Sequence, residues 1–231
     1  MKKLLLLMVL LSICIVCCNK EVLNNESYEK STVKIFTRSG IPLGLYTIHN
    51  CTGGTPYTNK YVMPSQNHDM ARVKCVDIEF VEAVNDPSLW AIESFNNDLV
   101  KFVSMDYGYF ELRRNLDIDW VHPNSDGSVD AVMYRDYNQT NQYWSLIGSK
   151  GTLPGGEIAS FLGVIVNKRT GQMLQLYKNY VPPPSDIYLI IDRQYKGSEE
   201  EKYFLEHGSF RGYCSSNSLD KSTIWLIHKE D

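Results

Sequence analysis

The chain repeats one pattern three times, and this repetition constrains its fold more than any other feature. Each copy opens with a short apolar strand, a polar turn that carries glycine, and a second apolar strand, and it ends on an aromatic residue. The copies open at Val33, Val100 and Val164. Because no single copy is large enough to bury a core alone, we expect three units packed around a common axis.

The aromatic residue at the end of each copy is expected to fill that shared core. Trp90 ends the first copy and Trp144 the second. The third copy ends either at Phe204, which keeps the spacing even, or at Trp225, which keeps the residue type. Each buried ring would contribute about 2–3 kcal/mol to stability. Closure at Phe204 gives units of about 32–95, 96–150 and 158–207, followed by a C-terminal tail, 208–231.

The rest of the chain predicts an all-β protein. Short apolar runs, among them 73–81, 129–134 and 187–191, alternate with clusters of Gly, Pro, Asn and Asp. No long segment after residue 33 shows a helical period. Many short strands separated by turn residues indicate a sandwich or a barrel, and the threefold repetition is the observation that decides between them.

The first residues read as an export signal. Lys2 and Lys3 precede an uncharged run of fifteen residues, Leu4 to Cys18, which is shorter than the roughly 20 residues of a membrane-spanning helix. Cys18 resembles the lipidated cysteine of bacterial lipoproteins. We therefore expect a signal peptide at 1–17, a polar tether at 18–31 and one domain at 32–231.

This organisation predicts a secreted protein or an outer-membrane or cell-surface lipoprotein, which contacts the membrane only through its lipid anchor. Ordinary cleavage near Cys18 would give a soluble secreted form instead. Once the leader is removed, Cys51, Cys75 and Cys214 remain. One disulfide and one free thiol are possible among these three in an oxidising compartment, and their pairing is open.

Two short motifs resemble those of the ricin-type β-trefoil lectins. Residues 164–174 are similar to the opening of a repeat in that family, in which a strand leads through an Asn-x-x-Ser/Thr-Gly turn, here Asn167 to Gly171, into an apolar strand. Gln142-Tyr143-Trp144 resembles the family's closing Gln-x-Trp motif. The resemblance covers about residues 33–205 and implies an all-β fold, a β-trefoil of three pseudo-repeats.

The same resemblance implies a sugar pocket in the second unit. In the family, an acid, an aromatic platform, a Gln and an Asn form the pocket. Carried over to this chain, Glu111 takes the acid position, Arg135 or its neighbour Tyr134 the platform, and Asn141 and Gln142 the closing motif. The alternative is that Asn141 and Gln142 only hydrogen-bond the turn.

The other two units are expected to have lost the pocket. In the first, Gly44 stands at the acid position and Pro87-Ser88 replaces the Asn-Gln pair. In the third, Gln175 stands at the acid position, and no aromatic platform follows. Two long loops, 50–70 and 179–186, offer a different recognition surface, since long loops on a rigid scaffold often bind partners.

These observations predict a non-catalytic protein that binds a glycan or glycoprotein, with no cofactor and no metal. The formal net charge of −4, without a basic patch, argues against nucleic acid as a binding partner. No hydrolase, metalloprotease or nucleotide-binding motif is present. A hydrolase remains as an alternative, because Asp117 and Asp119, like Asp77 and Glu79, place two acids on one face of a strand.

A second resemblance gives another possible function. A lipidated N-terminus, a short tether and one ricin-type trefoil are similar to the A subunit of the cytolethal distending toxins, and residues 34–46 resemble the opening of its trefoil. This resemblance implies that the protein anchors and binds cells for partner toxin subunits.

Overall fold

The computed structural model describes residues 45–51, 60–66, 68–77, 88–96, 99–105, 113–152, 158–177 and 187–229. The expected signal peptide, the tether and Cys18 lie outside these residues. The strands of the described part are β1 (Leu45–Asn50), β2 (Lys60–Pro64), β3 (Val73–Asp77), β4 (Leu89–Asn96), β5 (Leu99–Ser104), β6 (Arg114–Ile118), β7 (Val129–Arg135), β8 (Trp144–Thr152), β9 (Ile158–Asn167), β10 (Gln172–Leu176), β11 (Ile187–Gln194) and β12 (Trp225–Lys229). Its helices are the 3-10 turn η3 (Thr140–Gln142) and the α-helices α2 (Glu199–His207) and α3 (Arg211–Ser215).

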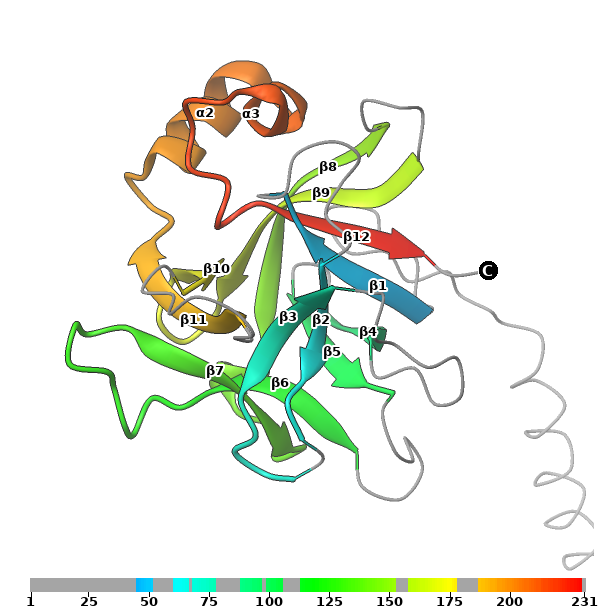
Figure 1. Cartoon of the computed structure of the whole chain (residues 1–231), viewed down its shortest axis with the longest axis vertical. Helices are drawn as coiled ribbons and strands as arrows, with labels where there is room; N and C mark the ends of the chain where they lie inside the picture. The colour runs from blue at the N-terminus through cyan, green and yellow to red at the C-terminus, as the bar shows by residue number, and fades with distance from the viewer. Residues whose placement is uncertain are drawn as a thin grey trace, which may run out of the picture. The chain divides into compact units, whose positions relative to one another are not determined.

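Six of the strands close into a barrel. Going round the ring, β1 pairs with β4, β4 with β5, β5 with β8, β8 with β9, β9 with β12, and β12 with β1, all antiparallel. The last pairing joins the first described strand to the last, and Figure 1 shows β1 in blue beside β12 in red. A closed ring leaves no unpaired strand edge.

The other six strands form one hairpin in each unit. β2 pairs with β3, β6 with β7, and β10 with β11. Strand β11 also pairs with β3 and with β7, so the three hairpins contact one another. A six-stranded barrel with three such hairpins, in units β1–β4, β5–β8 and β9–β12, is a β-trefoil, which confirms the expected fold.

A buried tryptophan occupies the same place in every unit. Trp90, Trp144 and Trp225 begin or lie near the start of β4, β8 and β12, and each is 0% exposed. Each indole N–H donates to a backbone carbonyl on the second strand of its own unit. The acceptors are Val62 at 2.9 Å, Leu116 at 3.1 Å and Leu174 at 2.8 Å. The tryptophans therefore form part of the core, as the repeat predicted.

The third unit closes at Trp225, and the unit boundary expected at residue 207 is wrong. Tryptophan and acceptor are 28 residues apart in the first two units but 51 apart in the third. The additional residues form helices α2 and α3 between β11 and β12. Phe204 lies on α2, and β12, which was expected in a tail, is needed to pair with both β1 and β9.

Helix α2 was not expected from the sequence. Its N-terminus is capped by the Ser198 side chain, which accepts from the Glu201 backbone N–H at 3.1 Å, and it ends at Gly208 with φ of 67°. Tyr203 and Phe204 pack against a second hydrophobic cluster outside the central core. The helix is nine residues long and its first turn is acidic, so its sequence shows only a weak apolar period.

Strands β8 and β9 approach each other closely at one point. Gly148 faces Gly163 in their antiparallel ladder. A Cβ atom at Gly148 would lie 2.2 Å from the Leu162 carbonyl oxygen, and one at Gly163 would lie 2.2 Å from the Ile147 carbonyl oxygen. The ring of Phe161 lies next to both glycines. Only glycine fits at this crossing.

Candidate functional site

Asp117 is the centre of a buried polar cluster in the second unit. It lies on β6, and 1% of its surface is exposed. Its Oδ1 accepts from Asn141 Nδ2 at 2.6 Å and from the Ile118 backbone N–H at 2.6 Å. Its Oδ2 accepts from Tyr137 Oη at 2.9 Å and from Gln142 Nε2 at 3.0 Å. Four donors from three segments thus converge on one carboxylate.

The β6–β7 hairpin and η3 bring these side chains to one face. Asn115 pairs with Tyr134 and Asp117 with Val132 across the hairpin, and paired residues share a face of the sheet. The η3 turn then carries Asn141 and Gln142 onto this face. Gln142 Oε1 accepts from Asn115 Nδ2 at 3.2 Å, and Gln142 Nε2 also donates to the Arg135 carbonyl at 2.8 Å.

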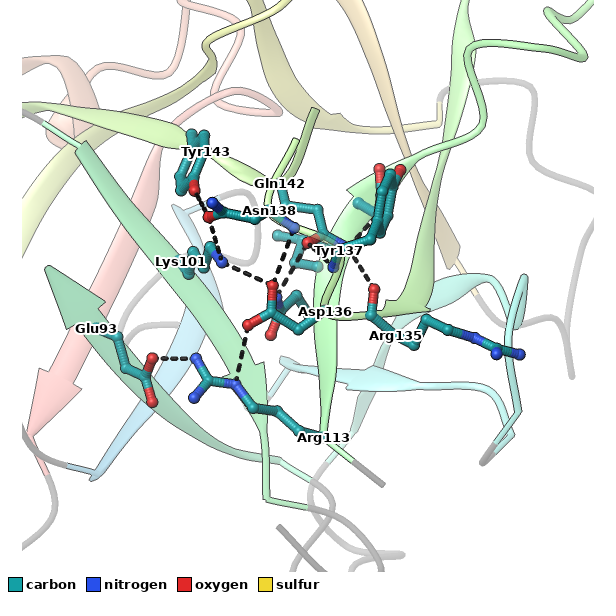
Figure 2. Close-up of polar contacts among 12 residues, drawn as sticks. Glu93, Lys101, Arg113, Arg135, Asp136, Tyr137, Asn138, Gln142 and Tyr143 are labelled. Atoms are coloured by element: carbon teal, nitrogen blue, oxygen red, sulfur yellow. Dashed lines mark hydrogen bonds and ion pairs between the residues drawn. The ribbon is translucent and has the colours of Figure 1, made fainter. Parts of the chain in front are cut away.

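Tyr137 covers the cluster. Its hydroxyl donates to Asp117 and accepts from Asn141 Nδ2, and its ring meets Tyr134 edge-on with centroids 5.2 Å apart. Burial is the main cause that raises the pKa of Tyr137 to about 12, so the hydroxyl keeps its proton at neutral pH. Figure 2 shows Tyr137 beside Gln142 and Asp136.

The cluster carries unused hydrogen-bonding capacity. Burial raises the pKa of Asp117 above its ordinary value, although the hydrogen bonds from Ile118, Tyr137, Gln142 and Asn141 act in the opposite direction. Within the described part of the chain, the buried Oδ1 atoms of Asn115 and Asn141 have no hydrogen-bond partner. Unsatisfied buried acceptors cost about 1–3 kcal/mol each, which favours a ligand that can donate to them.

A chain of charges fastens the segment that carries Tyr137 to the barrel. Lys101 Nζ on β5 contacts Asp136 Oδ1 at 2.7 Å, and Arg113 Nε lies 3.5 Å from Asp136 Oδ2. Arg113 in turn pairs with Glu93 on β4, and Figure 2 shows this sequence of contacts. Burial acts to raise the pKa of Asp136, but its polar contacts outweigh burial, and the pKa lies below its ordinary value. These contacts are the hydrogen bond from Lys101, the charges of Lys101 and Arg113, and the Asn138 backbone N–H.

The structure brings together three of the five side chains expected in the pocket. Tyr134, Asn141 and Gln142 share the face described above. Arg135 does not, because its exposed guanidinium pairs with Asp69, with Nη2 2.5 Å from Oδ2, and only its carbonyl reaches Gln142. Figure 2 shows the Arg135 side chain directed away from the cluster. Glu111 lies outside the described residues.

Asp117 was not among the residues expected in the pocket. It directly follows Leu116, the acceptor of the Trp144 indole, just as Gln175 directly follows Leu174, the acceptor of Trp225. Gln175 had been placed at the acid position of the third unit, so the same offset identifies Asp117 in the second. From the sequence, Asp117 was expected only as half of an acidic pair with Asp119, whose Oδ1 lies 3.0 Å from His122 Nδ1.

The other units lack this carboxylate. The equivalent of Asp117 is Met63 in the first unit, one residue after the carbonyl that Trp90 contacts. In the third unit, Gln175 Nε2 donates to Asp192 Oδ2 at 3.2 Å, and Ser222 and Thr223 replace the Asn-Gln pair.

The described residues contain neither a metal-binding cluster nor a membrane-spanning helix. No group of three or more His, Cys, Asp or Glu side chains there could hold a metal ion. None of the helices in the same part of the chain is long and apolar enough to cross a membrane.

Comparison with known proteins supports the fold alone. No family model and no curated protein matches the chain. A designed protein with threefold symmetry, ThreeFoil, superposes with a TM-score of 0.52 at 15% identity, over 81% of this chain and 99% of that one. A mosquitocidal holotoxin matches with a TM-score of 0.49 at 16% identity, over 82% of this chain and 17% of that one. A salivary protein from Culex quiquefasciatus matches with a TM-score of 0.47 at 14% identity, over 83% of this chain and 97% of that one.

Proposed function

We propose that this protein is a non-catalytic glycan-binding β-trefoil whose binding site is the Asp117 cluster of the second unit. The observation that carries the proposal is the convergence of Asp117, Asn141 and Tyr134 on one face. A pyranose presents neighbouring hydroxyls and an apolar ring face. A fixed carboxylate and amide beside an aromatic ring match both features.

Each residue has a distinct part in this proposal. The Asp117 carboxylate accepts from one sugar hydroxyl, and the Asn141 amide accepts from a neighbouring hydroxyl with its unpartnered Oδ1. Tyr134 stacks on the apolar face of the sugar. Gln142 is a positioning residue, because its amide group links Asp117 to Asn115 and to the Arg135 carbonyl.

A bound sugar would take the place of the Tyr137 hydroxyl. That hydroxyl donates one hydrogen bond to Asp117 and accepts one from Asn141, and a sugar hydroxyl can make the same two bonds. The exchange therefore conserves the number of hydrogen bonds and needs only the 136–138 segment to move. The affinity for the sugar is therefore set by the difference in free energy between the state with the sugar bound and the state with the Tyr137 hydroxyl in its place.

A glycan array with the full chain tests the proposal. We expect specific binding by the native chain, loss of at least about tenfold in affinity for Asp117→Asn and for Asn141→Ala/Gln142→Ala, and no change for Asp119→Asn. Asp119 is the matched control, because it is a carboxylate two residues away that contacts His122 instead of the cluster. Near-UV circular dichroism confirms that each variant is folded. A folded native chain that binds no glycan would overturn the proposal.

The proposal includes export, with or without a lipid on Cys18. Its support is the charged and apolar pattern of residues 2–18. The intact mass of the protein recovered from its producing cells distinguishes the forms, since removal of 1–17 and addition of a lipid to Cys18 each change it by a known amount. A protein that keeps its first seventeen residues would refute this part.

A further inference from the structure

Two cysteines meet where the helical insertion packs on the barrel. Cys51 follows β1 directly, and its backbone N–H donates to the Ile224 carbonyl at 3.0 Å. Cys214 lies on α3. Both belong to the second hydrophobic cluster, in which Cys51 is buried and Cys214 is half-buried. The pair thus links two segments that are distant in sequence.

The two side chains are in direct contact. Cys214 packs against the cluster that contains Cys51, the interaction with the Cys214 side chain is the main cause that raises the pKa of the Cys51 thiol, and both sulfurs are free thiols in the structure. Cys75, the remaining cysteine of the described part, lies on β3 and is buried in the central core. Contact therefore selects one pair from the three possible pairings and leaves Cys75 outside it.

We propose that Cys51 and Cys214 form a disulfide that fastens the α2–α3 insertion to the barrel. The oxidant is an external disulfide of the glutathione class. The Cys214 thiolate attacks it, forms a mixed disulfide and releases one external thiol, and the Cys51 thiolate then displaces the second external thiol. In total the two protein thiols lose two protons and two electrons, and the external disulfide becomes two thiols.

The environment of the pair determines how the reaction starts. Cys214 is the accessible partner, whereas 6% of Cys51 is exposed. The hydrogen bond to Cys214 and burial raise the pKa of the Cys51 thiol well above its ordinary value, against the charge of Lys221. The Cys51 thiol therefore loses its proton less readily, and its attack, which closes the bond, is the slow step.

The bond would close a loop over most of the trefoil. It would join residue 51 to residue 214, so the loop contains β2 to β11 and both helices. A cross-link over so long a loop restricts the unfolded chain strongly. We expect oxidation to raise the Tm by roughly 5–15 °C.

Peptide mapping of the full chain tests the proposal. The chain is purified under reducing conditions, incubated with oxidised glutathione, alkylated without reduction and digested with trypsin. We expect peptide 39–60 to be joined to peptide 212–221, while Cys75 remains alkylated after denaturation. The same cross-link should form in Cys75→Ser, which is the matched control, and the rise in Tm should be absent in Cys214→Ser.

Cys214→Ser keeps this test informative, because its half-buried position tolerates a hydroxyl better than the core position of Cys51. A stable glutathione adduct on Cys214 that does not proceed to the cross-link would overturn the proposal. Cross-links that involve Cys75 in the folded chain, or equal Tm shifts in native chain and Cys214→Ser, would overturn it as well.

Discussion

The indole N–H of Trp225 donates to the backbone carbonyl of Leu174 at 2.8 Å. The same bond joins the closing tryptophan to the second strand in the other two units. Because it connects equivalent atoms, this bond defines the correspondence between units more reliably than sequence spacing does. It also identifies Asp117, which follows one of the three acceptors, as the acid of the second unit.

Replacing the closing tryptophan should destabilise the whole trefoil. Trp225→Phe removes the indole donor, leaves the Leu174 carbonyl buried without it and reduces packing in the core. We expect a loss of about 2–4 kcal/mol in the free energy of unfolding. Phe204→Leu, on the insertion, should cost less than about 1.5 kcal/mol. Urea titration measures both values, and a larger cost for Phe204→Leu would contradict closure at Trp225.

The glycine crossing between β8 and β9 should not tolerate a side chain. Gly163→Ala places a methyl group 2.2 Å from the Ile147 carbonyl oxygen, so the two strands must separate. We expect a loss of about 3 kcal/mol or more in stability. Gly127→Ala is the control, because its φ of +82° is strained but nothing lies within 4 Å of the added carbon. Thermal unfolding should show a much smaller cost there.

Asp69 should stabilise the protein at neutral pH and lose this effect in acid. Partial burial opposes its charge, but hydrogen bonds and charges from Arg135 and Arg114 outweigh burial and lower its pKa below 3.8. Its contribution is therefore present above pH 3.8 and is lost as the pH falls through the lower folded-state pKa. Asp69→Asn should be less stable than the native chain at pH 7. In denaturant titrations this difference should shrink as the pH falls below 3.8.

Asp117 should show the opposite pH dependence. Burial raises its pKa above 3.8 in the folded state, so the fold takes up this proton more readily than the unfolded chain. Its favourable contribution is complete below pH 3.8 and declines as the pH rises through the folded-state pKa. The stability of the native chain relative to Asp117→Asn should therefore fall between pH 4 and pH 7. A constant difference over this range would contradict the raised pKa.

Tyr137 and Tyr134 should affect glycan binding in opposite directions. Tyr137→Ala removes the side chain that occupies the Asp117 cluster, so a sugar no longer has to displace it. We expect the affinity to rise several-fold. Tyr134→Ala removes the stacking platform and should lower the affinity about tenfold. Isothermal titration with a ligand found on the array measures both, and a loss of binding in Tyr137→Ala would show that Tyr137 is itself a ligand contact.

Much of the fold could be predicted from the sequence. Alternating apolar runs and turn residues indicated an all-β chain, and the threefold pattern with Trp90 and Trp144 indicated three units around a shared core. The closing motif pointed to Asn141 and Gln142. These features depend on residues close together in the sequence, where the period of the side chains and the preference of Asn and Gly for turns act directly.

The remaining features depended on the tertiary structure. Closure at Trp225 follows from the pairing of β12 with β1 and β9, which no local pattern encodes once an insertion precedes it. Tyr134 and Arg135 are neighbours in sequence, and the register of the hairpin places them on opposite faces. Asp117, Tyr137 and the Cys51–Cys214 contact likewise come from segments that only folding brings together. The sequence alone determined the class of fold and the number of units, because local side-chain patterns set them. Strand register and long-range pairing decided which side chains share a site.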